Sequence, residues 1–390
     1  CQQLRIMAKK TLFTRRQTLF FWLSTFASLS LLTSKNAFNP RQIDPLSRKF
    51  VASGNMSIGK RALIKGLSYG AAVNKNSLSS NPQLAASVAK ECAIIVPEWE
   101  LKWNFLRPTS TSFDFRPADW LAEFARTHGL LFRGHTLVWH EALPTWFVKT
   151  INSQNARQLL LEHITTVVKH YAGNIHSWDV VNEAINLQDG RSDGLRKTPW
   201  LQFIGRDYIE IAFRAAAEAD PKAMLVYNDY GLEYDTPEHE AKRKAVLNLL
   251  KELKSKGTPI HALGIQSHLS GNETRFNSEK FLKFLSEIAS LDLKILITEI
   301  DVKDKNLPVD IKVRDRIVAA TYEDYLSVVL NEPAVIAVLT WGLSDRYTWL
   351  SEYQPRRDGA KVRPLPLDAN FKRKLAWNAI ARAFDNAPHR

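Results

Sequence analysis

Cysteine is scarce in this chain of 390 residues, which contains only Cys1 and Cys92. A scaffold built from disulfides is therefore excluded, and the 45% share of hydrophobic residues is large enough for a substantial core without cross-links. Cys92 stands inside an apolar run that ends at Val96, and we interpret it as a small core residue of a buried strand. A reactive thiol is not expected here.

Several motifs that bind cofactors or activate nucleophiles are also missing. No GxGxxG or Walker sequence follows an apolar run, which disfavours dinucleotide and nucleotide chemistry. No GxSxG elbow is present, which disfavours acyl transfer by a serine. Ten histidines occur, but none forms a His-Glu-x-x-His pair and no cysteine pair accompanies them. We therefore expect neither a metal nor an organic cofactor.

Positive charge exceeds negative charge by 13, but it is unevenly distributed. Residues 1–49 carry nine basic side chains and one acidic one, which leaves about +5 for the other 341 residues. Those residues contain no run of basic side chains interleaved with aromatic ones, the pattern that a nucleic-acid groove requires. We expect no nucleic-acid partner.

The basic N-terminal segment is followed by fourteen mostly apolar residues, 19–32, without a charge. A membrane-spanning helix needs about 20 such residues, and this layout is typical of a secretory signal. Arg15 and Arg16 stand two residues before the apolar run, which leaves a twin-arginine route and a Sec route both open. We predict that residues 1–49 are a signal peptide and tether, that the protein is exported to the periplasm or exterior of a bacterium, and that a membrane anchor remains only if the leader is uncut. Loss of Cys1 with the leader would leave no internal disulfide.

The body, residues 50–390, alternates short apolar β-branched runs with longer segments of helical periodicity. Helical periodicity is clearest in residues 156–170, 208–219, 238–256 and 278–290, and Asp119 is expected to cap the helix before the third strand. Eight strands separated by helices over about 320 residues predict a single-domain (β/α)8 TIM barrel. The expected strands are residues 66–73, 92–96, 130–137, 175–182, 223–228, 260–266, 293–298 and 335–340.

Polar residues end nearly every one of these strands, and in such barrels the strand ends build the active site. Glu183 and Glu299 each end an apolar strand, the fourth and the seventh, so we expect their carboxylates to face each other across the barrel mouth. Paired carboxylates that flank a bond are the requirement of glycoside hydrolysis. The same ring holds indoles suited to sugar faces (Trp139, Trp341 and Trp349) and donors suited to hydroxyls (Lys102, His135, Asn182, Gln266 and His268). Trp120, Trp178 and Trp377 fit core packing better.

Five ordered motifs resemble the glycoside hydrolase family 10 endo-β-1,4-xylanases across residues 60–385. They are Gly134-His-Thr-Leu-Val-Trp-His140, Trp178-Asp-Val-Val-Asn-Glu183, Tyr227-Asn-Asp-Tyr230, Gly264-Ile-Gln-Ser-His268 and Ile297-Thr-Glu-Ile-Asp301. The resemblance implies that Glu183 is the general acid/base and Glu299 the nucleophile of a retaining reaction with carboxyls about 5 to 5.5 Å apart. It implies further that Asn182 holds the sugar 2-hydroxyl and that His268 supports the nucleophile. His140 and Asp301 are implied as further supporting residues. The residues implied to line the glycone subsites are Glu98, Lys102, His135, Trp139, Gln266, Trp341 and Trp349.

One position departs from the family pattern, which usually has Asn directly after the glutamate that corresponds to Glu98. Here Glu98 is followed by Trp99, so an amide that would bind hydroxyls is replaced by an indole. We expect weaker or altered use of short xylo-oligosaccharides. The predicted activity is a retaining endo-1,4-β-xylanase, a monomer that acts on xylan or xylo-oligosaccharides. A β-1,4-glucanase or mixed-specificity glycosidase, and a non-catalytic carbohydrate-binding protein, remain as alternatives.

Overall fold

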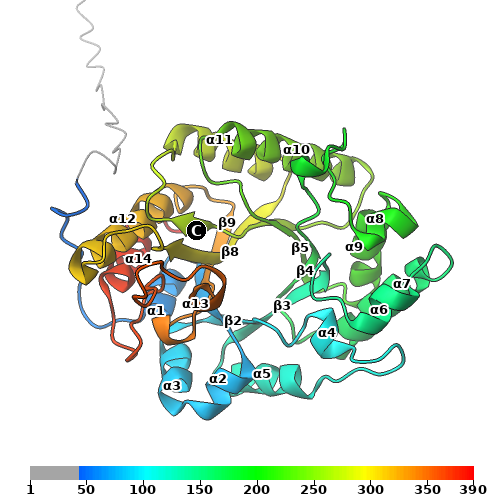
Figure 1. Cartoon of the computed structure of the whole chain (residues 1–390), viewed down its shortest axis with the longest axis horizontal. Coiled ribbons are helices and arrows are strands. Elements are labelled where there is room, and N and C mark those ends of the chain that lie inside the picture. Colours follow the sequence, from blue (N-terminus) through cyan, green and yellow to red (C-terminus); the bar gives the residue numbers. More distant parts are fainter. Residues whose placement is uncertain (1–43) are drawn as a thin grey trace, which may run out of the picture. The chain divides into compact units, whose positions relative to one another are not determined.

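Eight parallel strands close into a barrel in the computed structural model, which describes residues 44–390 (Figure 1). Each strand pairs with the next, and β1 also pairs with β9, where Gly70 lies opposite Leu339. On the other side β6 pairs directly with β8, where Ile265 lies opposite Ile297. The barrel strands are β1 Ser68–Val73, β2 Ile94–Pro97, β3 Leu131–Val138, β4 Ser177–Asn182, β5 Met224–Asp229, β6 Ala262–Ile265, β8 Lys294–Lys303 and β9 Val335–Thr340. The fold is the predicted (β/α)8 barrel.

Each expected strand coincides with a barrel strand, with differences of a few residues at the ends. One short strand was not expected. Strand β7, His268–Ser270, pairs with the C-terminal extension of β8, where His268 lies opposite Asp301. A three-residue strand is too short for an alternating pattern to reveal it in the sequence.

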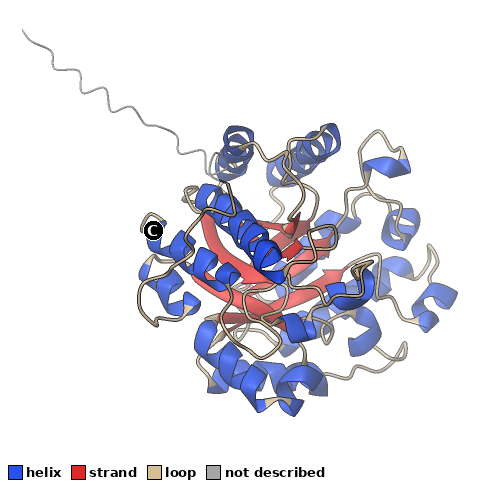
Figure 2. Cartoon of the chain, turned by 60° about the vertical axis from the view of Figure 1, so that its left-hand side comes forward, coloured by secondary structure: helices blue, strands red, loops and turns tan. Residues whose placement is uncertain are grey.

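Helices surround the strands (Figure 2). The main ones are α1 Ile58–Ile64, α3 Pro82–Glu91, α5 Arg116–Thr127, α7 Ala156–His170, α9 Tyr208–Ala219, α10 Pro237–Ser255, α11 Ser278–Ala289, α12 Ile311–Val329 and α14 Leu375–Asn386. Short helices occupy the loops: α2 Lys75–Ser80, α4 Trp103–Leu106, α6 Thr145–Thr150, η2 Leu187–Asp189, α8 Pro199–Ile204, η3 Asp345–Tyr347 and α13 Leu350–Tyr353. Helices α7 and α9 have the predicted bounds.

The predicted start of α5 was wrong. The helix begins at Arg116, three residues before Asp119, and Pro117 lies in its first turn, where the fixed φ of proline is compatible with a helix. The Asp119 carboxylate therefore lies inside the helix and accepts hydrogen bonds from His170 and from the hydroxyl of Tyr171, at 2.8 and 3.0 Å.

The apolar side chains form two clusters. The larger one fills the space between the sheet and the helices and includes Trp178 and Trp377, as expected, while Trp120 packs at its edge. The smaller cluster fills the barrel interior and ends at Trp341, with Trp349 packed against it. Two tryptophans predicted to bind sugar thus lie at the end of the interior core. Cys92 is buried, although it follows α3 rather than standing within β2, and burial raises the pKa of its thiol.

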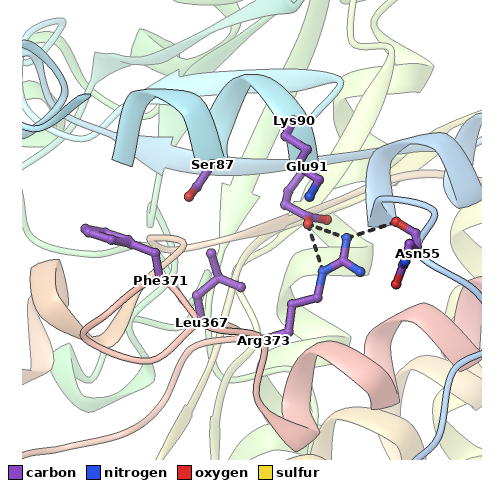
Figure 3. A pocket seen from close by; sticks show the side chains of 7 residues that line it. All are labelled: Asn55, Ser87, Lys90, Glu91, Leu367, Phe371 and Arg373. Carbon is purple, nitrogen blue, oxygen red and sulfur yellow. Dashed lines mark hydrogen bonds and ion pairs between the residues drawn. The ribbon is translucent and has the colours of Figure 1, made fainter. Parts of the chain in front are cut away.

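Glu91, at the end of α3, joins the first and last helices of the barrel. Its carboxylate accepts hydrogen bonds from the backbone of Ile58, from the Trp377 indole at 3.0 Å and from the Arg373 guanidinium at 2.7 Å. Figure 3 shows the Glu91–Arg373 pair at the wall of a cavity of about 410 Å³. The other residues that line this cavity are Asn55, Ser87, Lys90, Leu367 and Phe371.

Residues 1–43 of the predicted leader lie outside the described residues, so the proposed signal and its boundary stay predictions. Arg48, in the segment expected to be a tether, is buried and forms an ion pair with Asp324 of α12. Its backbone oxygen accepts a hydrogen bond from Arg316 of the same helix at 2.9 Å. Among residues 44–390, no helix is both long and apolar enough to cross a bilayer.

Candidate active site

The two predicted catalytic glutamates lie where β4 and β8 become irregular. Glu183 directly follows β4 and has a φ of 58°, in the left-handed region that few non-glycine residues adopt. Glu299 lies in a bulge of β8, since three steps along β8 from Ile297 to Ile300 match only two along β9. Bulges redirect side chains and are common beside active sites. Glu183 follows the carboxyl end of β4, and Glu299 lies just beyond the residues of β8 that pair with β6, so both glutamates stand at the end of the barrel where barrel enzymes place their chemistry.

The Glu299 side chain is buried, with 6% of its surface exposed, and each of its oxygens has a partner. The Asn228 amide donates to Oε1 at 2.8 Å, and the His268 Nε2 lies 3.3 Å from Oε2. The other ring nitrogen of His268 lies 3.0 Å from Asp301 Oδ1, and the Trp349 indole donates to Asp301 Oδ2 at 2.7 Å. A chain of hydrogen bonds thus runs from Trp349 through Asp301 and His268 to Glu299.

This chain sets the charge of both groups. Burial alone would raise the pKa of Glu299, but the hydrogen bond from His268, the nearby histidines and the Asn228 amide lower it to about 2. Burial would likewise lower the pKa of His268, but Asp301 and Glu299 raise it to about 10. Glu299 is therefore an anion at neutral pH, and His268 is a cation that donates from both ring nitrogens.

Glu183 is held by amides and lies close to one cation. Its Oε1 accepts hydrogen bonds from Gln266 at 2.9 Å and from Asn182 at 3.2 Å. Its Oε2 lies 4.0 Å from the Arg196 guanidinium, whose Nε donates to the backbone oxygen of Glu183 at 2.7 Å. Because 13% of its side chain is exposed, Glu183 is more accessible than Glu299.

Asn228 connects the two carboxylates. Its amide nitrogen donates both to Glu299 and to Asn182 Oδ1, the latter at 2.9 Å, and Asn182 in turn donates to Glu183. Its amide oxygen accepts from the Thr298 hydroxyl at 2.7 Å, which fixes its orientation. Space for it is made by Gly264, where an added Cβ would lie 2.3 Å from the Asn228 Oδ1.

Lys102 is enclosed by three indoles. Its ammonium lies 4.3 Å from the ring centre of Trp99, 5.0 Å from that of Trp139 and 5.9 Å from that of Trp341. Burial lowers the pKa of Lys102, although Glu299 and the other carboxylates of the site oppose this. Such a cage attracts the ammonium through the ring quadrupoles. Trp99, the residue that departs from the family pattern, is therefore part of the site.

Asp179 of β4 and Arg133 of β3 orient His135, which also lies on β3. The Nδ1 of His135 lies 2.9 Å from Asp179 Oδ2, while Arg133 donates to the other Asp179 oxygen. All three side chains are buried, and the imidazole packs 5.3 Å from Trp341, measured between ring centres. The imidazole of His135 is thus fixed beside the indole cage.

The remaining predicted residues are placed as follows. Glu98 directly follows β2 and accepts a hydrogen bond from Asn74 at 2.9 Å, and burial raises its pKa. His140 follows β3, and burial together with Arg196 lowers its pKa to about 4. Its Nε2 lies 3.6 Å from Glu141, and it stands outside the hydrogen bonds that join the two catalytic candidates. Every predicted site residue lies in the C-terminal half of a barrel strand or in the segment that follows it.

Four residues of the site, Asn228, Asp179, Arg196 and Thr298, had no role predicted from the sequence. Asn228 stands in one of the quoted motifs, yet an asparagine at a strand end has many uses and only its contacts with Glu299 and Asn182 reveal this one. Among the residues that the structure describes, no group of three or more potential ligand side chains is arranged to hold a metal ion. The site is thus a pair of carboxylates in a ring of amides, imidazoles and indoles.

Comparisons with known proteins identify the family and the relatives that this chain resembles. The family profile of glycosyl hydrolase family 10 matches residues 57–383. A beta-1,4-xylanase of Dictyoglomus thermophilum is 38% identical over 74% of this chain and 81% of its own length. Endo-1,4-beta-xylanase B of Thermotoga neapolitana is 35% identical over 84% of this chain and 92% of its own length. The crystal structure of xylanase 10B from Thermotoga petrophila in complex with xylobiose superposes with a TM-score of 0.78 at 33% identity, and covers 86% of this chain and 99% of that one.

Proposed function

The chain belongs to glycosyl hydrolase family 10, and from this premise we propose that it is an endo-1,4-β-xylanase that cleaves internal β-1,4-xylosidic bonds with retention of configuration. The observation that carries the proposal is the contrast between the two glutamates. Glu299 is held as an anion by a protonated His268, while the more accessible Glu183 accepts hydrogen bonds from neutral amides and has its nearest cation, Arg196, 4.0 Å away. A retaining glycosidase needs such a pair, one nucleophile and one proton donor.

In the first step the Glu299 carboxylate attacks the anomeric carbon of the sugar. The bond to the leaving oxygen breaks, and protonated Glu183 supplies the proton that this oxygen takes up. The result is a covalent glycosyl-enzyme ester on Glu299 and a free leaving-group hydroxyl. In the second step Glu183, now a carboxylate, removes a proton from water as that water attacks the same carbon and releases Glu299. Two inversions give net retention.

The groups around the carboxylates supply contacts for a xylan chain. We assign the sugar 2-hydroxyl next to the reacting carbon to Asn182, whose amide lies between Glu183 and Asn228. Lys102 and His135 supply donors at one side of the pair, and the indoles of Trp139 and Trp341 supply apolar faces there. The xylobiose complex of the Thermotoga petrophila relative supports xylo-oligosaccharides as ligands.

Export and the monomeric state are further parts of the proposal. The basic N-terminal segment and the apolar run of residues 19–32 support export by a Sec or twin-arginine route, with cleavage that releases the barrel from the membrane. Fractionation of the native host, with N-terminal sequencing of the mature protein, tests this. Light scattering of the purified protein tests the monomer.

Digestion of xylan by the purified protein tests the activity. We expect glucuronoxylan and arabinoxylan to be cut into oligosaccharides of several lengths, and turnover on cellulose to be much lower. Proton NMR during hydrolysis should show the β-anomer of the new reducing end before mutarotation. Replacement of Glu299 by Ala or Gln should abolish hydrolysis, and near-wild-type activity of that variant would end the assignment. Preferred turnover of cellulose would favour the β-1,4-glucanase alternative.

A further inference from the structure

Gln266 and His268 hold the two catalytic candidates, and only one residue separates them along the chain. Gln266 donates to Glu183 at 2.9 Å, and His268 contacts Glu299 at 3.3 Å. Ser267, between them, is fully buried and has a φ of 62°. A serine rarely adopts this left-handed conformation, which costs on the order of 1 kcal/mol or more, so surrounding contacts must hold it.

The left-handed residue coincides with a change of register. Ile265 of β6 lies opposite Ile297, but three residues later His268 of β7 lies opposite Asp301, four residues further along β8. The chain between β6 and β7 must therefore stretch across the bulge that contains Glu299. The backbone conformation of Ser267 decides whether Gln266 and His268 reach their two partners at the same time.

Glu233, in the loop between β5 and α10, holds Ser267 in this conformation. Its Oε1 accepts a hydrogen bond from the Ser267 backbone N–H at 3.1 Å, and its Oε2 accepts one from the N–H of Leu232 at 2.8 Å. Only 3% of Glu233 is exposed, so neither interaction competes with bulk water. The Ser267 hydroxyl is fixed as well, at 2.7 Å from the hydroxyl of Tyr325 on α12.

The loop that carries Glu233 is itself fixed. Arg243 of α10 donates to the backbone oxygens of Leu232 and Tyr234, both at 2.8 Å. The hydroxyl of Tyr234 accepts a hydrogen bond from the Ser270 N–H at 2.7 Å, a second contact between this loop and β7. The titratable and charged groups around Glu233 are His239 and Arg243 from α10 and Tyr325 from α12.

We propose that Glu233 is a positioning residue that acts on both carboxylates at once: by holding the Ser267 amide, it places Gln266 against Glu183 and His268 against Glu299. Glu233 itself contacts neither carboxylate. The inference rests on the proposed hydrolase function, and it adds a residue 34 positions upstream of Ser267 to the machinery of that site.

Replacement of Glu233 by Ala removes both acceptors. We expect kcat/KM on 4-nitrophenyl β-xylobioside to fall about 100-fold, mainly through kcat, because misplacement of reacting groups by about 1 Å has an effect of this size. The acid limb of the pH profile should move to higher pH, since a displaced His268 no longer lowers the pKa of Glu299. Glu233→Gln, which retains one acceptor oxygen, should recover most of the loss.

Tyr234→Phe is the matched control, because it removes the other hydrogen bond between the same loop and β7 without touching Ser267. We expect its melting temperature to fall by an amount similar to that of the alanine variant while its pH profile stays that of the wild type. If Glu233→Ala keeps the wild-type profile and kcat, or if both variants lose activity only in proportion to their melting temperatures, the proposal is wrong. Should the alanine variant not fold, Glu233→Asp decides, because its shorter side chain cannot reach both N–H groups, and an unshifted acid limb together with wild-type kcat in Glu233→Asp contradicts the proposal.

A second readout does not depend on turnover. NMR titration of the His268 imidazole should give a pKa near 10 in the wild type and a clearly lower one in Glu233→Ala, because the ring then loses its contact with Glu299. An unchanged titration would contradict the inference. A wild-type protein that shows the expected titration but does not cleave the xylobioside contradicts the proposed function instead, so the two failures are distinguishable.

Discussion

Removal of His268 should make hydrolysis sensitive to acid. The imidazolium donates to Glu299 and is itself held by Asp301, so His268→Ala removes both a hydrogen bond and a positive charge from a carboxylate that stays buried. Burial then acts against a weaker set of lowering interactions, those of His135 and the Asn228 amide, and the pKa of Glu299 rises from about 2 toward the ordinary value of about 4.3 for glutamate. A protonated Glu299 cannot attack the anomeric carbon.

The size of the effect follows from this shift. A change of about two pKa units corresponds to roughly 3 kcal/mol of lost preference for the ionised form. With the pKa of Glu299 near the ordinary 4.3 in the variant, only about a third of the molecules would carry the ionised nucleophile at pH 4, whereas nearly all wild-type molecules do. The ratio of kcat/KM at pH 4 to that at pH 7, measured on an aryl xylobioside, should therefore fall about threefold in His268→Ala.

The stability that His268 contributes to the folded protein should be lost at alkaline pH. Because the pKa of His268 is raised in the folded protein, to about 10 from about 6.5, its stabilising contribution is complete below pH 6.5 and is lost as the pH rises through 10. The difference in unfolding free energy between wild type and His268→Ala should thus shrink between pH 7 and pH 10. His128→Ala, at the exposed end of α5, is the control for loss of a histidine. Equal pH 4 to pH 7 ratios in wild type and His268→Ala would refute the reasoning.

Three other substitutions have defined outcomes. Gly264→Ala should lower both the melting temperature and kcat, because the new Cβ would lie 2.3 Å from the Asn228 Oδ1; unchanged values of both would contradict this packing. Trp99→Asn should uncover Lys102 and change kcat/KM on xylotriose and xylotetraose several-fold relative to polymeric xylan. A change of this size corresponds to one or two hydrogen bonds of about 1 kcal/mol each. Unchanged oligosaccharide kinetics would refute a role for the indole. Glu91→Gln should lower the unfolding free energy by about 2 kcal/mol without affecting kcat, because it breaks a largely buried ion pair remote from the carboxylates; a loss of kcat in fully folded protein would contradict this.

The sequence revealed those parts of the site that sit on regular strands. Glu183 and Glu299 were recognisable because each ends an apolar run, and the period of such runs predicts the barrel that brings them together. The contacts of Asn228 and Glu233 were not recognisable, because each joins segments far apart in the sequence. The left-handed backbone of Ser267 has no signal either, since serine carries no preference for it.

The unexpected strand β7 and the wrongly predicted start of α5 have a similar origin. Strand β7 exists because β8 extends beyond its bulge and offers a free edge, which is a property of the pair rather than of residues 268–270. The start of α5 was misplaced because Asp119 resembles a cap, whereas Pro117 and the preceding chain set the first turn. In both cases tertiary context overrides a local pattern.

The most direct test of the account is to identify the residue that becomes glycosylated. A 2-deoxy-2-fluoro-β-xylobioside with a good leaving group slows the second step of a retaining reaction, so the covalent intermediate accumulates and can be located by mass spectrometry of peptic fragments. The account predicts a single fluoroxylobiosyl adduct on Glu299 in the wild type. An adduct on another residue, or no adduct from protein that still hydrolyses xylan, would contradict it.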